Sequence, residues 1–270
     1  MAVSFNGITP QNVPNKGEPM IIDSHLHLPV DCPDFPARRT ALLAELRKNG
    51  VDRGIVIADS ALESTIGSTS DCADLFRGDP VIKVVAGISP FFSYREQLAL
   101  CRTLLEHGEI VGLKLFTGHE HFYCTDPVLD PVYDLAAEFS VPVLFHTGWD
   151  DAQYAAPQTM KQLAQRRPQN LFVYCHCYYP EAAQCFETLG CVENVYFELS
   201  SLADDPGKLP GIRQALAAAI PAMPHRFLFG SDFGSCSQRA HLDFAASLDI
   251  TAEQRELLMH RNACAVYHLN

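Results

Sequence analysis

Four segments decide the predicted fold of this chain of 270 residues, because each is an apolar run that ends in a metal-type ligand. They are Ile21-Ile22-Asp23-Ser24-His25-Leu26-His27, Val143-Leu144-Phe145-His146, Val173-Tyr174-Cys175-His176 and Phe227-Leu228-Phe229-Gly230-Ser231-Asp232. Short apolar runs of this kind are typical of buried strands. Four such strands that end in histidine or aspartate predict a metal site at one mouth of a barrel, and therefore an enzyme.

The first segment contributes two of the expected ligands. Side chains alternate along a strand, so His25 and His27 share one face while Leu26 points the other way. Both imidazoles can then reach one ion, and imidazole suits zinc and other divalent transition metals. Asp232 would add the negative charge that a divalent cation needs in a poorly solvated pocket. A lone histidine is more often structural, but this pair together with three matching strand ends favours a metal.

Apolar runs alternate with helical patterns in eight cycles along the chain. Amphipathic stretches such as 94–107, 128–139 and 158–167 predict crossover helices between parallel strands. Eight units of this kind can close an α/β barrel, the (β/α)8 or TIM fold, in a single domain. The domain is predicted to span 20–270, after an N-terminal extension over 1–19. The expected strands are 20–28, 53–59, 81–89, 110–117, 141–147, 170–177, 194–200 and 226–232.

Two features concern the helices near the end of the chain. Thr251-Ala252-Glu253-Gln254 has the pattern of an N-cap and predicts an additional C-terminal helix to about Leu269, outside the eight units. The segment 202–224 is interrupted by prolines and is expected to form only a short helix. These prolines are Pro206, Pro210, Pro221 and Pro224.

Composition limits the partners. The chain has 32 acidic and 20 basic residues, a net charge of −12 and no run of lysine or arginine, so it would repel nucleic acid. No uninterrupted apolar stretch is long enough to cross a bilayer, and residues 1–19 do not resemble a signal peptide. We therefore expect a soluble cytoplasmic protein with no membrane partner, and we leave homo-oligomerisation open.

The ten cysteines include no Cys-x-x-Cys pair and are expected to be reduced thiols. Cys175 and Cys177 flank His176, which would allow a thiolate metal site. Strand alternation, however, predicts that both sulfurs point away from the face that His176 uses, which favours packing.

The ordered set of motifs resembles the amidohydrolase superfamily, and within it the amidohydrolase-related, decarboxylase-like branch of metal-dependent TIM-barrel enzymes. The matching pieces are Asp23-x-His25-x-His27, Gly112–Leu115, Pro142–Gly148, the strand that ends at His176, Leu228–Asp232 and Arg261–Ala263. The resemblance implies one divalent metal ion, with zinc favoured over manganese, and no organic cofactor. Its ligands would be His25, His27, His146 and Asp232.

The resemblance also implies catalytic roles for His176 and Asp232. His176 would lie beside the metal and transfer protons, although a ligand role and a structural role remain open. A metal lowers the pKa of bound water toward about 7, and an imidazole with a pKa of about 6.5 can move protons near neutrality. Asp232 could bind the metal, accept the proton of the attacking water, or do both. Asp23 is either an acceptor behind the ligands or simply a buried hydrogen-bonding residue.

Lys114 has three interpretations. A fourth-strand lysine is carbamylated in binuclear members of the superfamily and bridges two metals. An unmodified ammonium could instead pair with Asp232 or with a substrate carboxylate, or it could form a structural ion pair.

The remaining residues predicted at this mouth would form a partly apolar substrate pocket. His119 and His121 follow the fourth strand, where they could contact substrate, lie in solvent or bind a metal. The expected substrate-binding residues are Lys114, His119, His121, Trp149 and Tyr178, with Asp150 and Asp151 nearby.

Three functions follow, each for a small-molecule ligand. The first is metal-dependent hydrolysis of a carboxylic ester, lactone or amide. The second is non-oxidative decarboxylation of a small aromatic or unsaturated carboxylic acid, and the third is a non-catalytic metal-binding barrel. We favour hydrolysis because the predicted mouth offers few cations to recognise a carboxylate.

Overall fold

The computed structural model describes residues 20–149 and 152–269, so the predicted extension over 1–19 lies outside the described residues. Eight parallel strands form one sheet in chain order. Every strand falls within its predicted range. The strands are β1 (Ile22–Leu26), β2 (Arg53–Ile57), β3 (Ile82–Gly87), β4 (Leu113–Leu115), β5 (Val143–Phe145), β6 (Phe172–Cys175), β7 (Val195–Glu198) and β8 (Phe227–Leu228).

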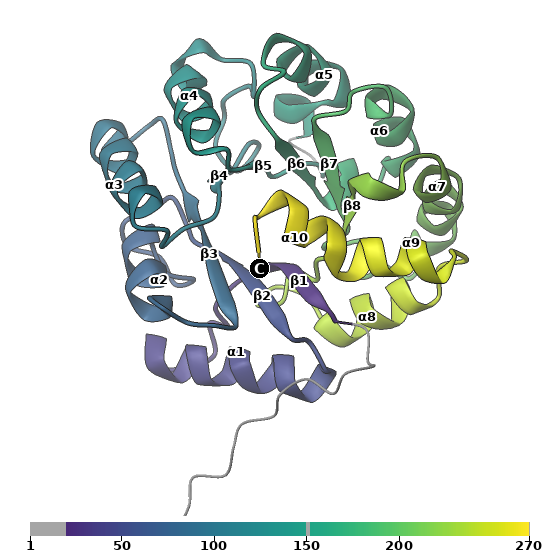
Figure 1. The fold of residues 1–270 in the computed structure, drawn as a ribbon, viewed down its shortest axis with the longest axis horizontal. Coiled ribbons are helices and arrows are strands. Elements are labelled where there is room, and N and C mark those ends of the chain that lie inside the picture. Colours follow the sequence, from purple (N-terminus) through teal and green to yellow (C-terminus); the bar gives the residue numbers. More distant parts are fainter. Residues whose placement is uncertain (1–19, 150–151, 270) are drawn as a thin grey trace, which may run out of the picture.

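The segments around β1 and β8 meet, which makes the barrel nearly closed (Figure 1). The Ser24 amide donates to the carbonyl oxygen of Phe229 at 2.9 Å, and the Asp232 amide donates to the carbonyl oxygen of His25 at 2.8 Å. This contact brings the two ends of the sheet, and with them His25 and Asp232, to one mouth. The predicted single-domain TIM barrel is confirmed.

The helices form an outer ring around the strands (Figure 1). Alternation along each strand builds two apolar layers: Leu144 and Val173 fill the barrel interior, while Phe145 and Tyr174 pack in the outer core that also includes helix side chains. The ring helices are α1 (Phe35–Asn49), α2 (Thr69–Phe76), α3 (Tyr94–Glu106), α4 (Asp130–Phe139), α5 (Pro157–Arg166), α6 (Ala182–Leu189), α7 (Leu209–Ala222) and α8 (Gln238–Ala246).

The C-terminal segment crosses the end of the barrel where the strands begin. It comprises α9 (Ala252–Glu256), one π-helical turn (Leu257–Arg261) and α10 (Asn262–Val266). The predicted N-cap is confirmed, since Thr251 and Gln254 form a reciprocal capping box. Val266 and Tyr267 pack with interior residues of the barrel, so this segment covers one end. The opposite mouth is left for the predicted site.

The expectation of a short helix within 202–224 is wrong, because α7 runs for 14 residues. Pro210 lies in its first turn, where a missing amide hydrogen leaves no bond unmade. Pro221 lies next to the last residue, where little helix remains to disrupt. Within the described part of the chain, no helix has the length and apolar character needed to span a bilayer.

Candidate metal centre

Three predicted ligands converge at the mouth formed by the carboxyl ends of the strands. Nε2 of His27 lies 3.2 Å from Oδ1 of Asp232, and Nε2 of His25 lies 3.6 Å from the same oxygen. All three side chains are buried, and one potential ligand atom from each lies within 4.8 Å of the other two. The structure therefore brings His25, His27 and Asp232 together as a group that could hold a metal ion.

The hydrogen bonds around this group fit a divalent cation. Nδ1 of His27 lies 3.0 Å from the carbonyl oxygen of Ile57, which can only accept, so Nδ1 carries the hydrogen and Nε2 keeps its lone pair. Oδ2 of Asp232 accepts a bond of 2.6 Å from Ser201, whereas its buried Oδ1 has no donor. An orphaned carboxylate oxygen beside two imidazole nitrogens suits a cation.

The Asp232 carboxyl is charged in this environment. Burial by itself would raise its pKa, but the neighbouring His25 and His27 hold the pKa well below its usual value. The group therefore offers one carboxylate and two imidazoles, a common ligand set for zinc and related ions.

His146 and His176 form a second pair beside the first group. The His176 ring centroid lies 5.1 Å from that of His25 and 4.8 Å from that of His146. Burial lowers the pKa of His176 to about 3 and that of His146 well below its usual value, so both imidazoles are neutral near pH 7. His146 is not part of the three-residue ligand group, and its role as a fourth ligand remains a prediction.

Trp149 covers both of these histidines from the solvent side. Its ring stacks on His146 at 5.3 Å with an interplanar angle of 16°, and meets His176 edge-on at 5.1 Å. The side chain is 42% exposed, so part of it meets solvent while the rest contacts neighbouring rings. This placement suits the predicted contact with substrate.

Both residues predicted to be catalytic have left-handed backbone conformations. The φ angle is 63° at His176 and 61° at Asp232, and it is 58° at Trp149 and 59° at Ser201. Such conformations are uncommon outside glycine, and they concentrate at functional sites, where the fold holds them in place. Here they turn the chain at the ends of β6 and β8.

The turn at His176 overturns one expectation about the cysteines. Strand alternation ends there, and the Cys175 sulfur points into the barrel, 3.4 Å from Nζ of Lys114. Cys177 does lie in the outer core. The Cys175 sulfur also lies within reach of His25 and Glu198. Burial raises its pKa, however, so it is a protonated thiol and a poor metal ligand.

Tyr178, which was predicted to contact substrate, is turned away from the histidines. The φ angles at His176, Cys177 and Tyr178 are all positive, which rotates this segment out of the strand direction. The Tyr178 ring packs on Tyr174 in the outer core at 6.4 Å. Tyr179 instead contacts Trp149 at 5.2 Å. The structure therefore does not support Tyr178 as a substrate-binding residue.

Lys114 points into the barrel and is only 1% exposed. Its Nζ lies near the Cys175 thiol and 5.4 Å from the centroid of the Phe116 ring. Among residues 20–149 and 152–269, no carboxylate forms an ion pair with it, so neither the pair with Asp232 nor a structural ion pair is present. The carbamate and substrate interpretations of Lys114 remain predictions.

The loop after β4 places one of its two histidines at the site. Both histidines are exposed, but the His119 ring centroid lies 4.1 Å from that of His146, whereas His121 stacks on Tyr154 at 5.1 Å. Asp150 and Asp151 lie outside the described residues.

A cavity of about 400 Å³ opens beside His119, lined by Asp59, Ser60, Ala61, Phe92, Phe116, His119 and Glu120.

Asp23 has a structural role behind the site. Its carboxylate accepts hydrogen bonds from the Ser231 amide at 2.9 Å, the Ser231 hydroxyl at 2.6 Å and the Gln238 side chain at 2.8 Å. It therefore braces the residue that precedes Asp232. Of the two interpretations offered by the sequence, buried hydrogen bonding describes these contacts.

Sequence reasoning missed Glu198, which ends β7 and is completely buried. Its Oε2 lies 2.5 Å from Nδ1 of His25. Burial by itself would raise the pKa of Glu198, but His25 lowers it to about 2, so the side chain is an anion. A glutamate within the apolar run Val195–Glu198 was the available signal, because a charged residue is almost never fully buried without a partner.

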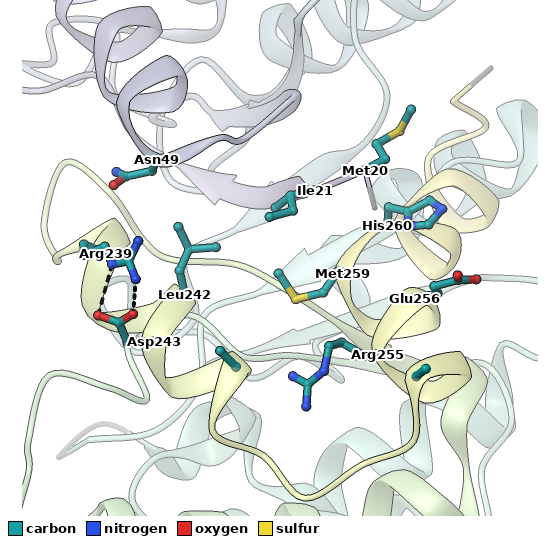
Figure 2. A pocket seen from close by; sticks show the side chains of 12 residues that line it. Met20, Ile21, Asn49, Arg239, Leu242, Asp243, Arg255, Glu256, Met259 and His260 are labelled. Atoms are coloured by element: carbon teal, nitrogen blue, oxygen red, sulfur yellow. Dashed lines mark hydrogen bonds and ion pairs between the residues drawn. The ribbon is translucent and has the colours of Figure 1, made fainter. Parts of the chain in front are cut away.

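A larger cavity of about 960 Å³ lies at the other end of the barrel, near the start of β1 (Figure 2). Its lining includes Ile21, Leu242 and Met259 together with the ion pair between Arg239 and Asp243. None of the predicted ligands or catalytic residues lines it. The smaller cavity is also not lined by the predicted ligands, but its His119 lies 4.1 Å from His146, so we assign substrate binding to the smaller cavity.

Comparisons with solved structures show the same fold. The chain is similar to an uncharacterized TIM-barrel protein from Bordetella bronchiseptica, with 20% identity and a TM-score of 0.76 over 93% of this chain and 99% of that chain. It is similar to 4-oxalomesaconate hydratase from Rhodopseudomonas palustris, with 16% identity and a TM-score of 0.67 over 92% and 96% of the two chains.

A third similar structure is a dihydroxybenzoic acid decarboxylase from Polaromonas, solved with bound manganese and the inhibitor 2-nitroresorcinol. It has 14% identity and a TM-score of 0.61 over 94% of this chain and 98% of that chain. No curated protein matches the chain. The family model described as Amidohydrolase matches residues 22–269, nearly the whole described barrel. The chain therefore belongs to the amidohydrolase superfamily of metal-dependent enzymes.

Proposed function

We propose that this protein is a hydrolase that cleaves an uncharged carboxylic ester, lactone or amide of a small molecule. His25, His27, His146 and Asp232 would hold one divalent ion, with zinc favoured and manganese as the alternative. When bound, the ion would polarise the scissile carbonyl and lower the pKa of a water molecule.

His176 and Asp232 would handle the protons of this reaction. His176 lies next to His25 as a neutral imidazole, the form that accepts a proton and can return it to the leaving group, although its lowered pKa makes it a weak base in the metal-free site. Asp232 has one carboxylate oxygen bonded to Ser201 and another directed at the imidazoles, which leaves the latter for a ligand or proton. Trp149 would exclude water from one side of the reacting carbonyl.

The observation that carries the choice of hydrolysis is the charge of the cavity beside His119. Asp59 and Glu120 line it, and none of the described residues that line it is a lysine or arginine. Glu120 is held by the hydroxyls of Ser60, at 2.7 Å, and Ser89. A carboxylate substrate would meet these acids rather than a cation, which disfavours decarboxylation. The aromatic rings of Phe92 and Phe116 suit a substrate with an apolar body.

Decarboxylation remains the second candidate because one observation favours it. Lys114 is a buried lysine without a carboxylate partner among the described residues, so its ammonium form could receive a substrate carboxylate. The similar fold of a manganese-containing decarboxylase is compatible with this reaction, and that of a hydratase is compatible with addition of water.

The test is a panel of lactones, esters, amides and hydroxybenzoates, offered to protein loaded separately with zinc and manganese. Acid release and carbon dioxide release are followed in parallel. We expect acid release from uncharged substrates and none with the His176→Asn variant. Carbon dioxide without net hydrolysis would overturn the proposal in favour of decarboxylation, and no turnover with fully loaded protein would favour a non-catalytic barrel.

A further inference from the structure

Two residues on and after β7 connect His25 to His176. Glu198 contacts Nδ1 of His25 at 2.5 Å, and the Ser200 hydroxyl lies 3.0 Å from the same carboxylate oxygen. The Ser200 hydroxyl also lies 2.7 Å from Nδ1 of His176. One buried carboxylate thus reaches both histidines, one directly and the other through a hydroxyl.

The donors and acceptors in this chain of contacts can be assigned from their chemistry. A carboxylate only accepts, so Nδ1 of His25 must carry the hydrogen that faces Glu198. The Ser200 hydroxyl has one hydrogen, which it donates to Glu198, so its oxygen accepts from Nδ1 of His176. The carbonyl oxygen of Ser200, 3.3 Å from Nδ1 of His176, requires the same hydrogen on that nitrogen.

We propose that Glu198 and Ser200 are positioning residues that fix the ring tautomers of His25 and His176. Each ring then carries its hydrogen on Nδ1 and its lone pair on Nε2. On His25 this lone pair is the one directed toward Asp232 and available to a metal. On His176 it is the one available to accept a proton. The inference deepens the proposed function, since it concerns the same site.

The packing around Glu198 shows that the barrel makes room for this carboxylate. The Ser200 amide donates to its Oε1 at 2.6 Å, so both oxygens are bonded. A Cβ atom added to Gly230 would lie only 2.1 Å from Oε1, and glycine at this position lets the carboxylate reach His25. A fully bonded carboxylate that holds an imidazole by its second nitrogen is the arrangement that orients metal-binding histidines.

The experiment measures the tautomers directly in metal-free protein. Long-range ¹H–¹⁵N spectra of protein labelled in its histidine rings distinguish a hydrogen on Nδ1 from one on Nε2. We expect the Nδ1–H form for both His25 and His176, with signals assigned by single replacement of each histidine. Zinc affinity is measured in parallel by competition with a chelating dye, so neither readout needs a substrate.

Two variants separate the effect of Glu198 on His25 from the effect of Ser200 on His176. Ser200→Ala should keep the His25 tautomer and the zinc affinity, but the Nε2–H fraction of His176 should rise, because only the longer contact to the backbone carbonyl oxygen of residue 200 then holds the hydrogen on Nδ1. Glu198→Gln should disturb both rings and weaken zinc binding by about 10- to 100-fold, the usual effect of losing such a partner. Ser200→Thr, which retains the hydroxyl, should restore the His176 signal.

Tyr174→Phe is the matched control, because it removes another buried hydroxyl that bonds a backbone carbonyl and no histidine. It should leave both tautomers unchanged. Unchanged tautomers in Ser200→Ala, or an equal loss of zinc affinity in Ser200→Ala and Glu198→Gln, would overturn the inference. If Glu198→Gln does not fold, the Ser200 pair still decides the effect of Ser200 on His176. Failure of the hydrolysis panel with the expected tautomers would refute only the proposed reaction.

Discussion

Replacing Gly230 with alanine should damage the site through a contact that is specific to Glu198. The new Cβ atom would lie 2.1 Å from Oε1 of Glu198 and 3.0 Å from Cβ of His25, where ordinary contacts begin near 3.4 Å. The backbone of His25 is fixed by its bond to the Asp232 amide, so the glutamate must move by more than 1 Å. Its bonds to His25 and to the Ser200 amide would then break.

The cost follows from those two bonds. Each joins a buried charged group to a donor, at 2.5 Å for His25 and 2.6 Å for the Ser200 amide. Hydrogen bonds to charged groups contribute about 1.5–3 kcal/mol each, so their loss predicts a decrease of about 3–6 kcal/mol in the free energy of unfolding. This is a large share of the roughly 5–15 kcal/mol that is typical of whole proteins.

Urea unfolding of metal-free protein measures this loss, and the zinc affinity of the variant should fall in parallel. Gly211→Ala is the matched control: the same substitution in α7, with no atom within 4 Å of the added Cβ. It should leave zinc affinity unchanged and raise helix stability by up to about 1 kcal/mol. A Gly230→Ala protein as stable as the control, with full zinc affinity, would refute this account of the packing around Glu198.

Three further predictions address the histidines and the tryptophan. Purified protein should contain about one divalent ion per chain, and metal at 100 times its Kd should stabilise it by about 2.7 kcal/mol in thermal unfolding; His27→Ala should abolish both effects, and full occupancy in that variant would contradict the ligand assignment. The pKa of His176 is lowered to about 3 from about 6.5 in the unfolded chain, so between these values the unfolded state binds more protons. Stability of the metal-free protein should therefore fall with decreasing pH by about 1.4 kcal/mol per unit, and urea unfolding of His176→Asn should show a smaller slope. Trp149→Ala removes ring contacts with His146 and His176 and should lower kcat/KM on the best panel substrate roughly tenfold without changing metal content, whereas an unchanged kcat/KM would place Trp149 outside the site.

The sequence was sufficient for the architecture and for the convergence of three of the four residues that we predict to bind the metal. Apolar strand runs and amphipathic helices are local patterns, and eight alternations leave few ways to bury all the apolar faces. Likewise, the positions of His25, His27 and Asp232 at strand ends predicted that they meet, because parallel strands align their carboxyl ends. The sequence did not predict the 14-residue length of α7. Its prolines were expected to interrupt a helix, but Pro210 and Pro221 lie near the two ends of α7, where proline is tolerated.

Contacts between distant segments were decided only by the tertiary structure. His25 and Glu198 are 173 residues apart in sequence, and no periodic pattern pairs an imidazole with a carboxylate across the barrel. The directions of His176 and Tyr178 depend on the positive φ angles that begin at His176, which alternation along a strand does not anticipate. A left-handed residue is stable only where surrounding packing compensates for its strain, and that packing exists only when the barrel is closed.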